Sequence, residues 1–168
     1  MEAPEFIFDQ VETMIANAGF TIVGRDHDRP WGGFLVINEA EAAKFALHFF
    51  VGKEIAEIES GGKLSPKILI VAPGKRLSWQ YHHRRAELWC CVQGPVSVAT
   101  SETDLERDIQ TLEPGNMINL ARGERHRLIG MNVWGVVAEI WQHTDPENPS
   151  DESDIVRLQD DFGRSSGQ

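Results

Sequence analysis

Residues 74–94 read GKRLSWQYHHRRAELWCCVQG, and this stretch decides how the fold is interpreted. If the chain around Tyr81 is extended, side chains two residues apart share one face of the strand. Gln80 and His82 then point the same way, and Glu87 can return to their face from the next strand after a short polar turn. Amide, imidazole and carboxylate groups that meet in this way suit a divalent metal. The stretch therefore predicts a metal site on paired strands.

A second segment offers a fourth ligand. Residues 114–126 open with a Pro-Gly turn and end in a histidine, His126. A lone histidine is more often an ordinary polar residue than a metal ligand. The combination of Gln80, His82, Glu87 and His126 reverses that expectation, and we predict that these four hold the metal. Such a mixed set accepts zinc, manganese, iron, cobalt or nickel, and the residues alone do not choose among them.

The length of 168 residues is about that of one domain. A net charge of −10 argues against nucleic acid or an anionic membrane as the main partner. The N-terminus shows no signal peptide, and no apolar run approaches the roughly 20 residues that span a bilayer. Cys90 and Cys91 are neighbours in a predicted strand, where a disulfide between them would be strained. We therefore expect a cytoplasmic protein.

The charges are unevenly distributed. Acidic residues gather at 102–113 and 145–161. Basic residues in or beside the two metal segments are Lys75, Arg76, Arg84, Arg85, Arg122, Arg125 and Arg127. A cationic pocket in an acidic protein suits a small anionic ligand, because guanidinium groups bind phosphate through two parallel hydrogen bonds. The alternative is that these arginines form surface ion pairs with nearby glutamates.

Two helices are predicted before these segments. Apolar residues recur with a helical period over residues 4–18, and Gly19 is placed to end that helix, which would cover one face of a sheet. A second helix over residues 39–50 has Asn38 as its N-cap, with Glu41 placed to complete a capping box.

Short strands fill the rest of the chain. They are predicted over residues 68–71, 77–81, 88–93, 96–100, 108–112, 117–120, 126–129 and 133–141, with turn residues between them. A polar loop over 143–153 precedes a short closing strand. This pattern predicts an all-β antiparallel jelly roll. We divide the chain into an N-terminal helical and strand extension packed on the barrel (1–60), the jelly-roll domain (61–164) and a disordered tail (165–168).

The ligand spacing resembles the first sequence motif of the cupin family. That motif runs Gly, five residues, His-x-His, three or four residues, Glu, six residues, Gly. Here Gly74, Gln80, His82, Glu87 and Gly94 stand at those places, so only the first ligand differs. The resemblance implies the cupin double-stranded β-helix for residues 61–164.

The second cupin motif resembles residues 115–130. Gly115, Gly123 and His126 match it, whereas Ala121 and Gly130 depart from it. Gln-x-His in place of His-x-His is similar to the mannose-6-phosphate isomerases and the isomerase domain fused to mannose-1-phosphate guanylyltransferase. Three further segments resemble that branch: Arg29-Pro-Trp-Gly32, Pro73-Gly-Lys-Arg-Leu-Ser78, and residues 154–164 reading DIVRLQDDFGR.

This resemblance implies a metal-dependent aldose–ketose isomerase, most like one that converts mannose 6-phosphate to fructose 6-phosphate, and it favours zinc. Arg85 and Arg157 match arginines of the isomerases, so we predict that both contact the substrate, a small phosphorylated sugar. Lys75 and Arg76 are further candidates for binding it. The alternative for Arg157 is a salt bridge that anchors the C-terminal segment.

Glu139 is the candidate proton carrier, provided that burial raises its pKa. A hydrogen-bond acceptor in the pocket wall is the commoner role for such a residue. Together, Arg85, Glu139 and Arg157 are the predicted catalytic residues.

Two other functions stay open. Departures from the isomerase pattern at Arg84, Leu88, Gln159 and Phe162 leave room for a non-catalytic cupin that contains metal and binds a sugar phosphate or sugar nucleotide. An iron-dependent dioxygenase usually has His-x-His, and Gln80 argues against it. Many cupins pair through sheet edges, so the resemblance also makes a homodimer plausible.

Overall fold

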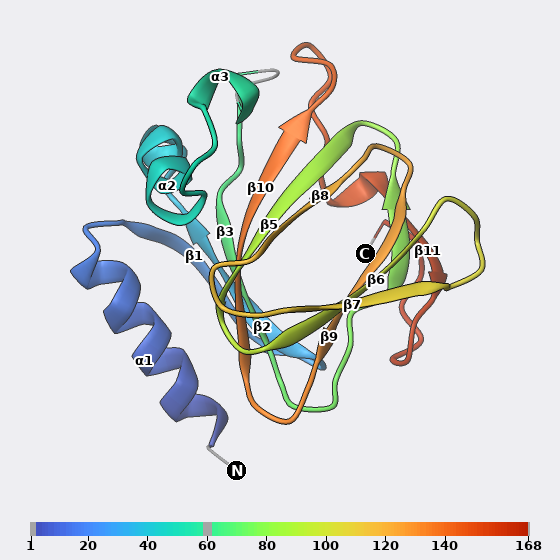
Figure 1. The fold of residues 1–168 in the computed structure, drawn as a ribbon, viewed down its shortest axis with the longest axis horizontal. Coiled ribbons are helices and arrows are strands. Elements are labelled where there is room, and N and C mark those ends of the chain that lie inside the picture. Colours follow the sequence, from blue (N-terminus) through green and yellow to red (C-terminus); the bar gives the residue numbers. More distant parts are fainter. Residues whose placement is uncertain (1–2, 59–61, 168) are drawn as a thin grey trace.

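The computed structural model describes residues 3–58 and 62–167, and two antiparallel sheets face each other in it (Figure 1). Sheet A contains, in spatial order, β1 (Ile22–Arg29), β2 (Gly32–Ile37), β3 (Lys67–Val71), β10 (Gly135–His143), β5 (Arg85–Gln93) and β8 (Met117–Leu120). Sheet B contains β11 (Ile155–Gln159), β4 (Trp79–His82), β9 (Arg125–Gly130), β6 (Val96–Ser101) and β7 (Asp108–Leu112). The predicted jelly roll is confirmed, including its short closing strand β11.

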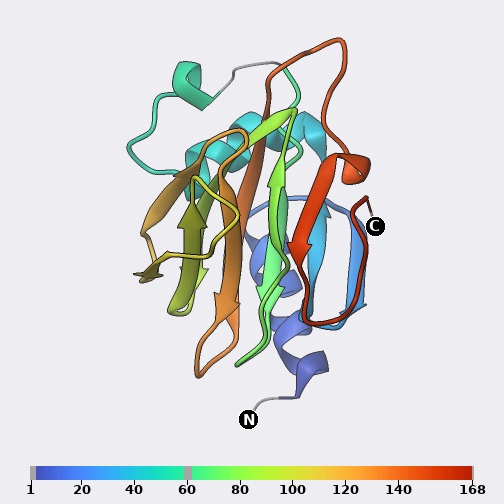
Figure 2. The same ribbon diagram turned by 90° about the vertical axis from the view of Figure 1, so that its right-hand side faces the viewer.

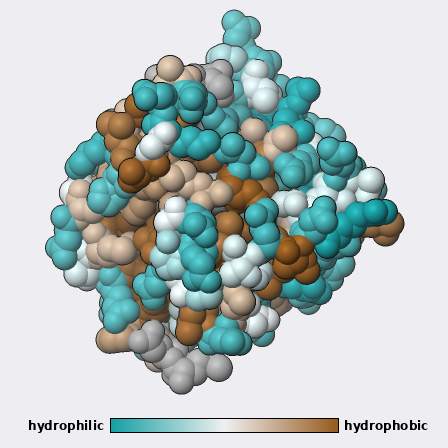
Figure 3. Space-filling model, viewed as in Figure 1, coloured by the Kyte–Doolittle hydropathy of each residue, from teal (hydrophilic) through white to brown (hydrophobic). Residues whose placement is uncertain are grey.

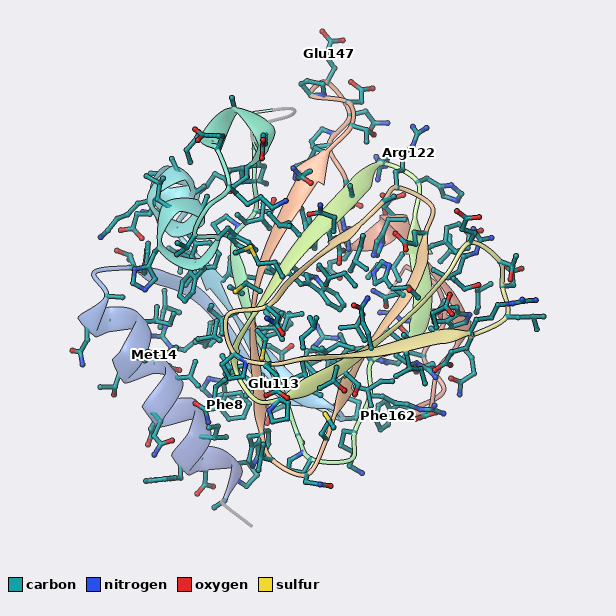
Figure 4. The ribbon with its side chains drawn as sticks, viewed as in Figure 1. Phe8, Met14, Glu113, Arg122, Glu147 and Phe162 are labelled. Atoms are coloured by element: carbon teal, nitrogen blue, oxygen red, sulfur yellow. The ribbon has the colours of Figure 1, made fainter. Side chains whose placement is uncertain are left out.

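Helices cover the outer face of sheet A. Helix α1 (Pro4–Asn17) and helix α2 (Ala42–Phe49) share one hydrophobic cluster with the outward side chains of β3, β5 and β10. Figure 4 shows Phe8 on the side of α1 that faces the sheet. As predicted, α1 ends just before Gly19, whose φ of 85° is a left-handed conformation that glycine adopts without strain.

Both faces of the central strands β3, β5 and β10 are buried, which explains their continuous apolar runs. In β3, Ile68 and Ile70 pack toward the helices, whereas Leu69 and Val71 pack between the sheets. The cysteines divide in the same way, because Cys90 lies in the outer cluster and Cys91 in the inner one; both are free thiols.

The sequence predicted strands in the N-terminal extension but did not locate β1 and β2. Only part of β1 is apolar, and it lies at the edge of sheet A, where every second side chain is exposed. The two glycines Gly32 and Gly33 begin β2. A Cβ atom on Gly32 would lie 2.0 Å from the Ile70 carbonyl oxygen, so glycine is required for the close approach to β3.

The second helical segment differs in detail from the prediction. It divides into a 3-10 turn (Glu39–Glu41) and α2, and a short helix α3 (Ile55–Ile58) follows. Asn38 caps the turn by accepting from the Ala40 backbone N–H at 3.1 Å. Glu41 does not close a capping box, because its carboxylate accepts hydrogen bonds from the backbone N–H and hydroxyl of Thr21.

The boundary predicted at residues 60 and 61 lies outside the described residues, and the division into domains stays a prediction. Residues 165–167 were expected to be disordered. Instead they hydrogen-bond to β11, since Ser166 Oγ accepts from the Arg157 backbone N–H and the Gly167 N–H donates to the Ile155 carbonyl. Gln168, the last residue of the predicted tail, is outside the described part of the chain.

Across residues 3–58 and 62–167, the longest apolar helices fall short of the length that crosses a bilayer. The face drawn in Figure 3 mixes hydrophilic and hydrophobic residues. Exposed large apolar side chains come from separate elements, among them Leu47 of α2 and Ile109 of β7. The homodimer stays a prediction.

Candidate metal centre

The four predicted ligands come together between the sheets. Gln80 of β4 pairs with His126 of β9, and side chains directly opposite each other on antiparallel strands share a face. Glu87 of β5 approaches from sheet A, where its Oε1 lies 3.1 Å from His82 Nε2 and its Oε2 lies 3.4 Å from His126 Nε2. One ligand atom from each of His82, Glu87 and His126 lies within 4.8 Å of the others, and all three residues are buried.

The hydrogen bonds of His126 orient its ring. Nδ1 lies 3.0 Å from the carbonyl oxygen of Glu124, which can only accept, so Nδ1 carries a proton and Nε2 is directed toward Glu87. Three buried polar atoms of the cluster have no hydrogen-bond partner: His82 Nδ1, Glu87 Oε2 and His126 Nε2. Leaving such atoms unpaired is costly, and a cation bound by Glu87 Oε2 and His126 Nε2, which lie 3.4 Å apart, would remove that cost for these two atoms. The cluster therefore fits a divalent metal.

Gln80 lies beside this cluster with its amide turned away. Its Oε1 accepts a hydrogen bond from Ser78 Oγ, and its Nε2 lies 3.4 Å from His82 Nε2. Rotating the amide by half a turn would present the oxygen to the cluster and leave the Ser78 hydroxyl to accept from Nε2. Gln80 can thus supply an oxygen ligand without moving its backbone.

The electrostatics make two of the ligands ready for a metal. Burial lowers the pKa of His82 to about 4, so its imidazole is neutral at physiological pH. Burial alone would raise the pKa of Glu87, but contacts with His82 and the charge of Arg85, which donates to Oε1 at 2.8 Å, hold it well below its usual range. The pKa of His126 is raised, against the effect of burial, by Glu87 and the Glu124 carbonyl, so a metal would displace a proton there. A neutral imidazole and an ionised carboxylate are the forms that bind metal.

Arg85 is the buried cation of the site, with 2% of its surface exposed. Its Nε donates to Glu87 Oε1 at 2.8 Å, its Nη1 donates to Ser150 Oγ at 2.9 Å, and its Nη2 lies 3.2 Å from His82 Nε2. The guanidinium carbon sits 3.6 Å from the ring centroid of Trp141. A buried ion pair is stable only when its remaining polar atoms are also hydrogen-bonded, as those of Arg85 are here. These contacts hold the Glu87 carboxylate in position.

The loop after β10 supports Arg85 through Ser150. The Ser150 hydroxyl donates to Asp154 at 2.6 Å, and its backbone N–H donates to His143 Nδ1 at 2.9 Å. Asp154 in turn accepts from the backbone N–H groups of His83 and Arg84. The polar loop predicted over 143–153 is therefore tied to the turn between β4 and β5.

Glu139 of β10 is a hydrogen-bond acceptor in the pocket wall, and its role as proton carrier stays a prediction. Its two carboxylate oxygens accept from the indole N–H groups of Trp89 and Trp141, each at 2.9 Å. Burial, together with the negative charge of Glu87, raises the pKa of Glu139 to about 7. A carboxyl group that is half ionised near neutral pH is suited to carrying a proton.

A cavity of about 570 Å³, counting its open mouth, connects these groups. Gln80, Arg85, Glu87, Glu139 and Arg157 line it, whereas the two histidines reach it through Glu87.

Two predicted substrate contacts, Lys75 and Arg76, are not among the residues that line this cavity. Arg76 forms an ion pair with Asp161 at 2.6 Å instead. A substrate role for Lys75 and Arg76 stays a prediction. His83 is exposed against Tyr81, as strand alternation implies.

Sequence reasoning missed several residues of the site. Lys67 lines the cavity, pairs in register with Glu139 and lies 4.0 Å from the Trp141 ring centroid. A lysine directly before the apolar run of β3 could have been recognised in the sequence as a candidate cation at the end of a buried strand. Ser150 had no comparable signal, because its contact with Arg85 spans 65 residues of sequence.

Comparisons with known proteins agree with this geometry. The family described as mannose-6-phosphate isomerase, C-terminal, matches residues 49–160, which is more than half of the chain. The alginate biosynthesis protein AlgA of Pseudomonas aeruginosa is 33% identical over 109 residues, which cover 65% of this chain and 21% of that protein. A mannose-1-phosphate guanylyltransferase of Escherichia coli is 31% identical over 107 residues, covering 64% and 21%.

The chain thus spans about one fifth of the length of these relatives. Among solved structures, the capsular polysaccharide assembling protein CapF of Staphylococcus aureus superimposes with a TM-score of 0.52 at 14% identity, over 83% of this chain and 32% of that one. At that identity the likeness supports the fold alone. Together with the family match, which includes all four ligand positions, it leads to one conclusion: the chain is a cupin that belongs to the mannose-6-phosphate isomerase C-terminal family.

Proposed function

We propose that this cupin domain is a metal-dependent isomerase that interconverts an aldose phosphate and a ketose phosphate, most like mannose 6-phosphate and fructose 6-phosphate. The observation that carries the proposal is the meeting of a metal-ready cluster and a carboxyl group of raised pKa, Glu139, in one cavity. The isomerisation needs both features, because it moves a proton between adjacent carbons and builds negative charge on two sugar oxygens.

His82, Glu87 and His126, with Gln80 after its amide turns, would hold the metal. Zinc is the favoured ion, and it would supply positive charge for the two sugar oxygens. Arg85 keeps the Glu87 carboxylate in position through the 2.8 Å hydrogen bond to Oε1, which leaves Oε2 for the cluster.

Glu139 would transfer the proton. Its ionised form takes the proton from C2 of the aldose to give an enediolate, the hydroxyl proton moves from O2 to O1, and the Glu139 carboxylic acid returns its proton to C1 to give the ketose. The indole N–H groups of Trp89 and Trp141 stabilise the ionised carboxylate, while burial stabilises the neutral form. Because these effects oppose each other, the Glu139 carboxyl group can gain or lose its proton at little free-energy cost near neutral pH.

The non-catalytic alternative is weakened by where the departures from the isomerase pattern lie. Arg84, Leu88, Gln159 and Phe162 are all absent from the cavity lining. Arg84 binds Asn148 and Asp151, and Leu88 packs in the outer cluster of sheet A. Differences at these positions therefore leave the cavity itself unchanged.

The test is an isomerase assay on the purified chain with mannose 6-phosphate, before and after chelation. We expect chelator to abolish fructose 6-phosphate formation and added zinc to restore it. The variant H82A should lose both bound metal and activity, whereas the exposed neighbour variant H83A should keep both. Full turnover in protein shown by elemental analysis to be free of metal would refute the proposal. Binding of the sugar phosphate without any turnover would favour the non-catalytic alternative.

A further inference from the structure

Three arginines from distant parts of the sequence line the same cavity as Glu87 and Glu139. Arg29 ends β1, Arg157 lies in β11, and Arg164 follows β11 in the C-terminal segment. Figure 2 shows β11 and the C-terminal segment, in red, against the blue strands of the first hairpin. The two segments that resemble the isomerase branch outside the metal motifs, residues 29–32 and 154–164, thus contribute their arginines to one place.

Most of the cations at this end of the cavity already have an acidic partner. Arg29 pairs with Asp26 at 2.8 Å, and Arg164 pairs with Asp160 at 2.7 Å. Lys67 pairs with Glu152 at 3.0 Å. These carboxylates neutralise Arg29, Arg164 and Lys67. Arg157 differs from these three cations in its partners.

Arg157 has no carboxylate within ion-pair distance in the described part of the chain. Its Nη1 donates to the Ser165 carbonyl at 2.7 Å, and its Nε is buried without a hydrogen-bond partner. Burial, followed by the positive charge of Arg164, lowers the pKa of Arg157, and the charge of Arg29 acts in the same direction. A buried guanidinium donor with cationic neighbours is costly unless an anion binds it.

The position of Arg157 relates this cation to the metal cluster. Arg157 is paired with Gln80, and Gln80 is paired with His126, so the three share the inner face of sheet B in one row. Two strand spacings, about 10 Å, separate the ends of this row. A ligand whose anionic group binds at Arg157 would therefore extend past Gln80 toward the metal cluster.

We propose that Arg157, flanked by Arg29 and Arg164, is the subsite that binds the phosphate group of the substrate. A phosphate carries a charge of about −1.5 to −2 at neutral pH and accepts two parallel hydrogen bonds from a guanidinium. The identity of the rest of the ligand rests on the proposed function, whereas the anion subsite rests on Arg157 itself.

The test compares binding of mannose 6-phosphate, unphosphorylated mannose and inorganic phosphate to the full metal-loaded chain by calorimetry. We expect the wild type to bind mannose 6-phosphate at least tenfold more tightly than mannose, with inorganic phosphate competing. The variant R157Q should lose that preference, and R157K, which keeps the charge without the two-pronged geometry, should recover part of it. The control R107Q removes the same charge from an exposed arginine outside the cavity and should bind like the wild type.

An unchanged preference for the phosphorylated sugar in folded R157Q would overturn the subsite. If R157Q fails to fold, R157K decides: binding equal to that of the wild type would also overturn it, and a loss confined to the phosphorylated ligand would support it. The two proposals fail separately. A wild type that binds phosphate through Arg157 but never turns over would exclude the isomerase and keep the subsite. If R157Q turns over mannose 6-phosphate with the KM of the wild type, the isomerase is kept and the Arg157 subsite is excluded.

Discussion

Both faces of β10 are buried, but only the inner one carries charged or titratable side chains. On β10, Val136, Ala138 and Ile140 pack outward into the helical cluster, whereas Glu139 and His143 point inward. The outer face packs mainly through apolar contacts, with Gln142 at its end donating to the Glu57 and Ile58 carbonyls.

The inner face has an apolar cluster of its own, which includes Val137, and a polar region in which most buried side-chain atoms have partners. Of the four exceptions among the described residues, three lie at the candidate metal centre and the fourth is Arg157 Nε. Unpaired polar atoms, more than burial, therefore distinguish the functional face from the structural one.

The largest effect is expected from E87Q on the inner face. The variant removes the carboxylate charge that pairs with Arg85, so we expect loss of bound metal and activity. A fall of about 3–5 kcal/mol in the free energy of unfolding should accompany it, because the buried guanidinium is left unpaired. Elemental analysis and denaturant unfolding measure the two effects. Glu113, an exposed glutamate labelled in Figure 4, provides the control E113Q. Normal metal content in E87Q would contradict the assignment.

The matching change on the outer face is I140A. Truncating this fully buried side chain should lower the free energy of unfolding by about 2–5 kcal/mol, because it leaves a cavity against the helical cluster. Metal content and activity per folded molecule should be unchanged at temperatures where the variant is folded. Metal loss from folded I140A would show that the two faces are not separable.

Glu139 predicts a pH dependence in the metal-free protein. Its pKa is about 7 in the folded protein and 4.5 in an unfolded chain, so the unfolded state ionises first as pH rises. Stability is therefore full below about pH 4.5 and is lost up to about pH 7, by roughly 3 kcal/mol from this group. Because the lowered pKa of His82 changes stability in the opposite direction over this range in both proteins, the contribution of Glu139 is measured as the difference between wild type and E139Q in denaturant unfolding. E139Q should lack this contribution, and an identical slope in both proteins would argue against the raised pKa.

The smallest effect is expected from S150A, which acts on the inner face through Arg85. Loss of the Ser150 hydroxyl removes one partner from Arg85 and one from Asp154, so we expect a cost of about 1 kcal/mol in stability and a several-fold weaker metal affinity. Metal titration and thermal unfolding measure this. Ser153, whose hydroxyl binds exposed Asp151, gives the control S153A. Equal metal affinity in S150A and S153A would rule out a positioning role for Ser150.

The sequence predicted most of the jelly roll and brought the four ligands together, because these features depend on local spacing. Strand alternation alone places Gln80 and His82 on one face, and the structure agrees. The pKa of Glu139 was also foreseeable, since it follows from a single glutamate buried in a strand.

What the sequence could not predict depends on long-range pairing. Arg76 belongs to the motif region, yet it turns to Asp161, which is 85 residues away in the sequence. Arg85 relies on Ser150 across 65 residues. Strand β1 was not located from the sequence because an edge strand needs few apolar residues and so gives a weak alternating pattern.

The most direct test of the metal centre is anomalous X-ray scattering from a crystal of the zinc-loaded chain. We predict one strong zinc peak within about 2.0–2.2 Å of His82, Glu87 and His126, with the Gln80 amide oxygen turned toward it. A peak bound elsewhere, or none between these side chains in protein that contains zinc, would contradict the account.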